Sequence, residues 1–191
     1  MHRIIFEQTL LNMEKRVFEN PLIKDKVTLL ETSRETNGAY TLLEVELLPG
    51  GGNGPHFHKS FSEEFIPVEG NLGIVKNGKK ILLNPGENAS VAPRQVHNFY
   101  NPGNETIRFH VKLVPGHEGF ENGIKIAYGL ATDNKTNKKG VPSDFAHLGI
   151  IMKLTDTGLP GMMSVLEPFF KWKTKRAVRK GIEQALIEQY S

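Results

Sequence analysis

The chain has 191 residues, 38% of them hydrophobic, and this length can bury one substantial core, so we expect one domain with an extension. It contains no cysteine, which excludes disulfides, thiolate metal sites and a cysteine nucleophile, and leaves histidine and carboxylate side chains as the strong metal ligands. The net charge of +3 arises in residues 167–191, where six basic residues stand against three acidic ones; elsewhere the charges balance at 18 each, which argues against a basic groove and a nucleic-acid partner.

The N-terminal segment does not have the pattern of a secretory signal. It carries Glu7 and Glu14 and only a short apolar run, Ile4–Phe6. Farther along, the longest apolar stretches, 148–152 and 159–170, are bounded or interrupted by charged residues and proline. They fall short of the roughly 20 apolar residues that a membrane-spanning helix needs. We therefore expect a cytoplasmic protein without a transmembrane segment.

Residues 26–114 alternate short β-type runs with turn residues, at the spacing typical of a β-sandwich or jelly roll. Asn77-Gly78 predicts a tight hairpin. In the last run Phe109 and its alternate neighbours face the core, so His110 faces solvent and is not expected to bind metal. The expected strands are Val27–Glu31, Ala39–Leu48, Phe61–Val68, Leu72–Lys76, Lys80–Leu83, Ala89–Ala92, His97–Tyr100 and Thr106–Val114.

Two segments within these runs carry candidate metal ligands. His56 and His58 lie two residues apart, so in a strand both imidazoles project from one face and can reach one ion. Glu63 follows across a short turn, where its negative charge would offset the charge of the ion. Residues 86–101 supply one more imidazole, His97. Because burying these groups without a partner is costly, we expect a metal site and not simply a polar barrel mouth.

Other side chains of this region have less specific roles. Phe65 and Phe99 lie two residues after Glu63 and His97, and therefore on the same strand faces as these ligands. They either line the pocket beside the ion or pack in the core. The remaining histidines are expected to be structural. These are His2, His110, His117 and His147.

The two segments resemble the two motifs of the cupin superfamily, G-x5-H-x-H-x4-E-x6-G and G-x5-P-x-G-x2-H-x3-N. The second motif matches with Ala92 and Arg94 in place of its proline and glycine, and the proline appears one residue later as Pro93. Glu64 sits one place too late for the ligand position. The first motif matches at every position, and the residues that carry the two matches are Gly50, His56, His58, Glu63, Gly70, Gly86, His97 and Asn101.

The resemblance covers roughly residues 26–114 and implies a double-stranded β-helix, a jelly-roll barrel. It implies one divalent ion, Fe, Mn, Ni, Zn or Cu, held by the three histidines and Glu63, with one or two positions left for water or substrate. It also implies a homodimer. The whole chain is similar to bacterial single-domain cupins of unassigned activity that have a helical C-terminal region. We thus expect a barrel domain with its N-terminal segment at 1–115 and a helical extension at 116–191.

After Pro115-Gly116 the apolar period changes from two residues to that of a helix. The basic stretch Lys171–Lys180 has Phe169, Phe170 and Trp172 beside it. An amphipathic helix that docks on the barrel or on a second subunit explains this stretch better than a helix lying on an anionic membrane. The helical faces are formed by Phe120, Ile124, Ala127, Tyr128 and Leu130, by Phe145, Leu148, Ile151 and Met152, and by Val178, Ile182 and Leu186.

Three functions are compatible with these features. The first is a metal-dependent, dioxygenase-like enzyme that acts on a small organic molecule. The second is a binding or sensor module that captures a small ligand without changing it. The third is a scaffold whose basic helical tail contacts a membrane or a protein. No catalytic residue can be assigned beyond the ligand set, since Glu64, Tyr40 and Tyr100 are candidates only by proximity in sequence.

Overall fold

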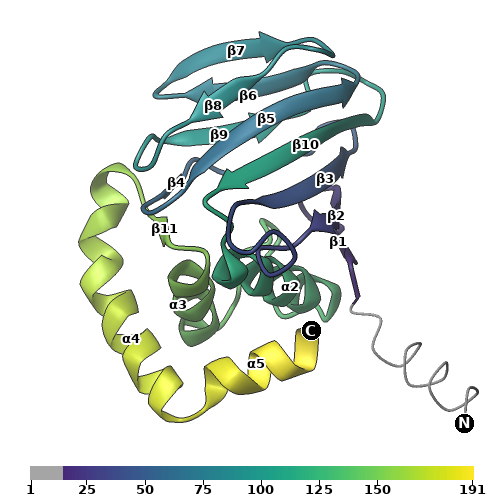
Figure 1. Ribbon diagram of the computed structural model, residues 1–191. Helices are drawn as coiled ribbons and strands as arrows, with labels where there is room; N and C mark the ends of the chain where they lie inside the picture. The colour runs from purple at the N-terminus through teal and green to yellow at the C-terminus, as the bar shows by residue number, and fades with distance from the viewer. Residues whose placement is uncertain (1–14) are drawn as a thin grey trace, which may run out of the picture.

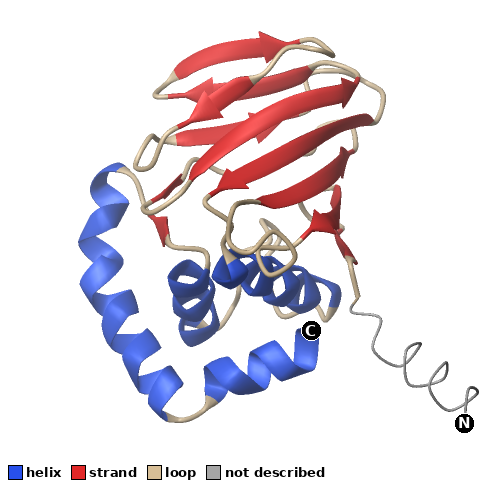
Figure 2. Cartoon of the chain, viewed as in Figure 1, coloured by secondary structure: helices blue, strands red, loops and turns tan. Residues whose placement is uncertain are grey.

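The computed structural model describes residues 15–191. The predictions for the first fourteen residues, namely the missing secretory signal and a structural role for His2, lie outside the described residues. From residue 15 onward, antiparallel strands form a jelly-roll barrel and the helices gather at one end of it (Figures 1 and 2). Over the same residues, no helix combines the length and apolar character needed to cross a membrane. The predicted fold class, mainly β with a helical C-terminal extension, is confirmed.

The largest sheet has the strand order β1-β2-β3-β10-β5-β8 and a smaller sheet has the order β7-β6-β9. A third, two-stranded sheet joins β4 (Phe57–His58) to β11 (Thr157–Gly158). Each strand expected from the sequence is present, and β1, β4 and β11 are additional. β4 and β11 have two residues each, too few to show a period-two pattern. The other bounds are β1 (Val17–Asn20), β2 (Asp25–Glu31), β3 (Thr41–Leu47), β5 (Ser62–Glu69), β6 (Leu72–Lys76), β7 (Lys79–Leu83), β8 (Ala89–Val91), β9 (His97–Tyr100) and β10 (Ile107–Val114).

The hairpin between β6 and β7 has the predicted two-residue turn. Lys76 pairs with Lys79, and the two residues between them, Asn77 and Gly78, have φ angles of 49° and 78°. Positive φ at both central positions is the requirement of the type I′ turn, whose twist matches that of the flanking strands. Asparagine and glycine tolerate this conformation better than other residues, which confirms the prediction.

The barrel core is built from alternate residues of the strands. In β10, Phe109, Val111 and Leu113 are buried, while His110 on the opposite face is half-buried and lies 3.3 Å from Glu44. Full burial of a side chain such as Phe109 stabilises the fold by about 1.5–3 kcal/mol. A register slip of one residue would turn this apolar row outward, so the pattern also determines the register.

The helical extension contains α2 (Glu118–Thr132), α3 (Phe145–Leu154), the 3-10 helix η1 (Gly161–Leu166), α4 (Glu167–Arg179) and α5 (Ile182–Tyr190). The side chain of His117 caps α2 by accepting a hydrogen bond from the backbone N–H of Phe120, and that of Asp144 caps α3 by accepting from Ala146. The expected helical face through Val178, Ile182 and Leu186 is divided between two helices. Gly181, with φ 75°, interrupts the helix and separates α4 from α5.

Helix α2 belongs to two cores at once. Phe120 and Tyr128 pack into the barrel core, whereas Ile126 and Leu130 belong to a second core with Ile150 of α3. The second core also includes Ala177 and Leu186, so α4 and α5 wrap the outer side of α2 and α3 (Figure 1). The end of the barrel is therefore covered by a helix that is itself held in place by the rest of the extension.

Candidate metal centre

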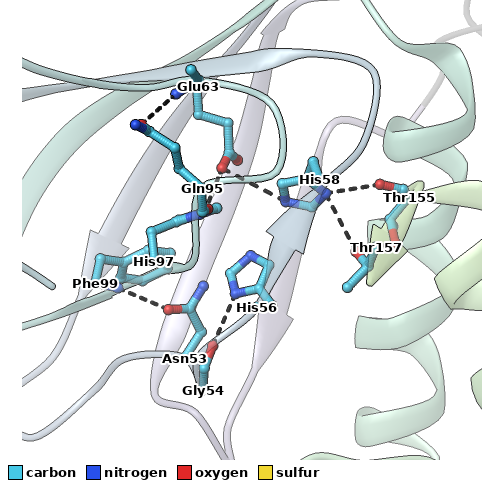
Figure 3. Close-up of polar contacts among 11 residues, drawn as sticks. Asn53, Gly54, His56, His58, Glu63, Gln95, His97, Phe99, Thr155 and Thr157 are labelled. Atoms are coloured by element: carbon cyan, nitrogen blue, oxygen red, sulfur yellow. Dashed lines mark hydrogen bonds and ion pairs between the residues drawn. The ribbon is translucent and has the colours of Figure 1, made fainter. Parts of the chain in front are cut away.

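Three neighbouring strands place the predicted ligands around one point. His56 lies just before β4 and forms an antiparallel bridge with His97 of β9, with N···O distances of 3.0 and 2.8 Å between their main chains. His58 ends β4, and Glu63 lies on β5. Figure 3 shows the three rings and the carboxylate turned toward one another.

The four side chains approach closely enough to share one ion. One ligand atom from each residue can be chosen so that all four lie within 4.8 Å of one another. Glu63 Oε2 is 2.6 Å from His97 Nε2 and 3.6 Å from His58 Nε2. His58, Glu63 and His97 are 4%, 5% and 2% exposed, and His56 is half-buried at the rim. Three nitrogens and one oxygen of this spacing suit a first-row transition metal.

The second nitrogen of each imidazole faces a main-chain carbonyl. Nδ1 of His56 is 2.9 Å from the Gly54 oxygen, and Nδ1 of His97 is 3.0 Å from the Gln95 oxygen. Because a carbonyl oxygen only accepts hydrogen bonds, each of these Nδ1 atoms carries the proton and each Nε2 presents a lone pair. An oriented ring with its lone pair directed inward is the arrangement found around metal-bound histidines.

His58 is oriented from outside the barrel. Its Nδ1 lies 2.9 Å from the main-chain oxygen of Thr155 and 3.3 Å from the hydroxyl of Thr157 (Figure 3). Both threonines follow α3, and Thr157 pairs with His58 in the β4–β11 sheet. The extension thus selects the tautomer of a histidine in the first motif. Nothing in the sequence around residues 155–157 indicated this role.

Several buried acceptor atoms of the cluster have no donor. Among residues 15–191, His58 Nε2, His97 Nε2 and Glu63 Oε2 have no hydrogen-bond partner. A lone pair on His97 Nε2 and a carboxylate oxygen 2.6 Å away repel each other unless a proton or a cation lies between them. A divalent cation satisfies all three atoms at once, so the residues fit the ion that the donor set implies.

The electrostatics of the cluster favour the form that binds metal at three of its four residues. Burial, together with His58 and His97, lowers the pKa of His56 to about 4, and burial lowers the pKa of His58 as well. Burial alone would raise the pKa of Glu63, but the neighbouring histidines outweigh it and hold that pKa at about 2. Burial also opposes protonation of His97, but contact with Glu63 raises its pKa overall. Neutral imidazole and ionised carboxylate are the ligand forms.

The turn before His97 accommodates the departure from the second motif. Arg94, at the glycine position, has φ 67°, the left-handed conformation that glycine adopts most readily. Its N–H donates to the His58 oxygen at 2.7 Å. The Gln95 side chain accepts from the Ala92 N–H at 2.9 Å and closes the turn. This chain therefore keeps a positive φ at this position without glycine or the usual proline.

The cluster borders a cavity of about 310 Å³ between the barrel and the helices. Phe65 and Phe99 both line it, and α2 closes one side with Phe120 and Ile124. Further apolar walls come from β2, β3 and β10, and polar groups are few. The polar residues are Asp25, Asn53, His56, His58, Glu63, Tyr128, Thr155 and Thr157.

The residues singled out only by proximity lie elsewhere. Glu64, Tyr40 and Tyr100 are not among the residues that line this cavity, and the Tyr40 hydroxyl donates to Glu31 at 2.8 Å. Asn101 donates to the Leu47 and Glu105 oxygens and accepts from Gly103, which is a turn-forming role. Sequence reasoning overlooked Asp25 and Tyr128, because a single aspartate and a helical tyrosine have no motif around them.

Comparison with known proteins identifies the region that surrounds the site. Residues 43–114 match the family model described as Cupin domain. A segment of 88 residues is 28% identical to quercetin 2,3-dioxygenase of Bacillus subtilis (strain 168), covering 46% of this chain and 26% of that protein. The chain therefore spans about a quarter of the length of this curated relative.

Solved structures with a similar arrangement cover about half of the chain. KdgF from Halomonas sp. superposes with a TM-score of 0.48 and 16% identity, over 56% of this chain and 92% of that one. An RmlC-like cupin from Shewanella frigidimarina superposes with a TM-score of 0.48 and 18% identity, over 57% and 91%.

Proposed function

Since this chain belongs to the cupin superfamily, with its cupin domain at residues 43–114, we propose that His56, His58, Glu63 and His97 hold one divalent transition metal, which binds a small organic molecule in the barrel. One observation carries this proposal. Buried Nε2 and Oε2 atoms of the cluster have no hydrogen-bond donor, and the Nδ1 atom of each of the three imidazoles is already bonded to a carbonyl oxygen. Fe, Mn, Ni, Zn and Cu all suit this donor set.

The chain itself would orient and shield the bound molecule. When bound, the ion would supply a Lewis acid, or a centre that binds O2 if it is iron. The carbonyl oxygens of Gly54, Gln95 and Thr155 hold the rings in their ligand orientation. Phe65, Phe99 and the apolar face of α2 keep bulk water away from the cavity. A volume near 310 Å³ is at the lower end for small-molecule sites.

We propose dioxygenase-like oxidation as the reaction class. The support is the local likeness, 28% identity over 88 residues, to a protein named quercetin 2,3-dioxygenase. A small-molecule binding or sensor role is the second candidate. It is favoured by the position of Glu64, Tyr40 and Tyr100, which do not line the cavity.

Metal analysis of the purified protein, followed by oxygen uptake with catechols, flavonols and 1,3-diketones, tests both roles. We expect about one metal per chain, lost in His58→Ala and kept in the matched variant His110→Ala, whose histidine faces Glu44 on the outer side of β10. Oxygen uptake that needs His58 supports the enzyme, and saturable binding of an unchanged molecule supports the sensor. Equal metal content in the two variants would refute the site.

Packing explains some of the apolar side chains of the basic helix α4. Phe170 and Ala177 of α4 are buried, while Phe169 and Trp172 are exposed beside the lysines. α4 packs on α3 of the extension, a partner other than the barrel or the second subunit expected from the sequence. Vesicle flotation with and without residues 171–191 tests membrane contact. The division at residues 115/116, the homodimer and the cytoplasmic location stay predictions.

A further inference from the structure

A second polar group, apart from the metal cluster, lines the cavity. Asp25 begins β2 and Tyr128 lies on α2. The Tyr128 hydroxyl donates to Asp25 Oδ2 at 2.7 Å, and both residues border the same cavity as His56, His58 and Glu63. Asp25 and Glu63 lie on strands β2 and β5 of the same sheet, and β3 and β10 lie between these two strands.

The Asp25 carboxylate is only half satisfied. Its side chain is 3% exposed, and Oδ1 has no hydrogen-bond partner among residues 15–191. The adjacent lysines are occupied elsewhere: Lys24 Nζ donates to the Pro49 oxygen at 3.1 Å, and Lys26 Nζ lies 2.6 Å from Glu46. A buried acceptor without a partner is destabilising, and such groups are retained where a ligand completes them.

A purely structural role leaves this oxygen unexplained. The bond from Tyr128 ties α2 to the barrel through Oδ2 alone. The cavity wall around it is otherwise apolar, with Ile23, Val27 and Ile124, so no other described residue lining this wall offers Oδ1 a hydrogen.

We propose that Asp25 Oδ1 accepts a hydrogen bond from a hydroxyl group of the small molecule in the cavity. This inference rests on the proposed function, because the other end of that molecule lies at the histidine–glutamate cluster. The ligand class that fits is a molecule with an oxygen group for the metal, an apolar part that contacts Phe65 and Phe99, and a separate hydroxyl for Asp25.

The protonation states restrict this arrangement to the pH range in which Asp25 is ionised. Burial raises the pKa of Asp25 to about 7, although the hydrogen bond from Tyr128 and its own main-chain N–H oppose the rise. Burial and the Asp25 carboxylate raise the pKa of Tyr128 well above its usual range, so its hydroxyl keeps its proton and stays committed to Oδ2. Oδ1 is thereby left for the ligand, as an acceptor when Asp25 is ionised.

The test uses ligand pairs that differ by one hydroxyl. Calorimetry is done at about pH 8.5, where Asp25 is ionised, on the full chain loaded with Zn²⁺, because zinc does not support redox turnover of the ligand. It compares 4-(hydroxymethyl)catechol with 4-ethylcatechol, and 4-(2-hydroxyethyl)catechol with 4-propylcatechol. We expect at least one hydroxyl member to bind the wild type about tenfold more tightly than its methyl analogue, the effect of a hydrogen bond to a charged group. The preference should fall below about threefold in Asp25→Leu, which removes both acceptors at similar size.

A second Asp–Tyr pair of the chain is the matched control. The Tyr190 hydroxyl donates to Asp133 Oδ2 at 2.6 Å, and neither residue lines the cavity. Asp133→Leu should keep the full preference. If Asp25→Leu does not fold, Asp25→Leu/Tyr128→Phe replaces both polar partners and restores a satisfied interior.

Two results would overturn the inference: no ligand pair is discriminated by the wild type, or the preference survives in the Asp25 variant. Zinc content separates this failure from failure of the proposed function. One Zn²⁺ per chain in the wild type and in both aspartate variants, without an Asp25-dependent preference, refutes the hydroxyl site alone. Absence of zinc binding in the wild type refutes both.

Discussion

The cupin domain and the helical extension contribute to the site in different ways. The domain supplies the ligands, all within residues 56–97, whereas the extension supplies the carbonyl that orients His58 and the helix that closes the cavity. The ligands lie on strands whose alternation determines where each side chain projects. The contributions of the extension depend on how distant segments dock. The ligands and the orientation of His56 and His97 thus come from local sequence, whereas the orientation of His58 comes from tertiary packing.

Truncation on the two faces of α2 tests this division most strongly. Phe120 packs in the barrel core, 5.5 Å from His58 between ring centroids, while Ile126 packs in the helical core. We expect Phe120→Ala to lower the free energy of unfolding by about 3–5 kcal/mol and Ile126→Ala by about 2–5 kcal/mol. Urea unfolding and zinc titration measure both effects. Only Phe120→Ala should weaken metal binding; an equal loss in Ile126→Ala would mean that the two faces are not separable.

The raised pKa of Asp25 predicts that the stability of the contact between the barrel and α2 depends on pH. Its folded-state pKa, about 7, lies above the usual aspartate value of 3.8, so the folded protein holds the proton more tightly. The stabilisation is complete below about pH 4 and is lost as the pH rises through about 7. One pKa unit corresponds to about 1.4 kcal/mol, so the full loss is on the order of 4 kcal/mol.

Unfolding free energies of the wild type and Asp25→Leu between pH 4.5 and 8 measure this loss. Titration of the histidine cluster is common to both proteins and cancels in their difference. The wild type should lose stability relative to the variant as the pH rises. A difference that does not change with pH would contradict the raised pKa.

Two adjacent glutamates of β5 test how specific the ligand pattern is. Glu63 faces the histidines, while Glu64 projects to the other side of the strand. Replacing the anionic ligand in Glu63→Gln should weaken zinc binding about a hundredfold, or about 2.7 kcal/mol, because the amide cannot offset the charge of the ion. Competition with a chromophoric chelator measures the affinity. Glu64→Gln should bind zinc as the wild type does, and a similar loss there would refute the assignment.

The smallest effect on zinc binding is expected for a substitution in the extension. Thr157→Val removes the hydroxyl that lies 3.3 Å from His58 Nδ1 but keeps the main-chain acceptor of Thr155. Loss of one outer partner should weaken zinc binding by up to about tenfold. The same chelator assay decides it. Ser164→Ala, an exposed hydroxyl in η1, should have no effect.

Much of the fold could be predicted from the sequence, and the reason differs between regions. The strands from Asp25 to Val114 have a clear period-two pattern and turn residues, and the Asn77-Gly78 turn has a fixed geometry. The convergence of His56, His58, Glu63 and His97 follows from the same pattern once two motifs are aligned. Whether they bind metal stays a prediction.

The remainder could not be predicted because it depends on contacts between distant segments. The orientation of His58 by Thr155 links positions 97 residues apart, and Asp25 meets Tyr128 across 103 residues. The break between α4 and α5 depends on one glycine, Gly181, inside a run that otherwise suits a helix. Side-chain type alone carries no signal for such pairings.

The pairing of β4 with β11 has a consequence for how this protein can diverge. Thr157 and His58 are joined through main-chain atoms, and the oxygen that orients the imidazole also belongs to the backbone. Exchanges of side chains along this short connection should therefore leave that oxygen in place, except at Gly158, where a Cβ would lie 2.1 Å from Phe57. Inserting or deleting a residue between α3 and β11 would instead shift the register and displace the oxygen from the ring. Length, and not composition, should be the inherited property of this connection.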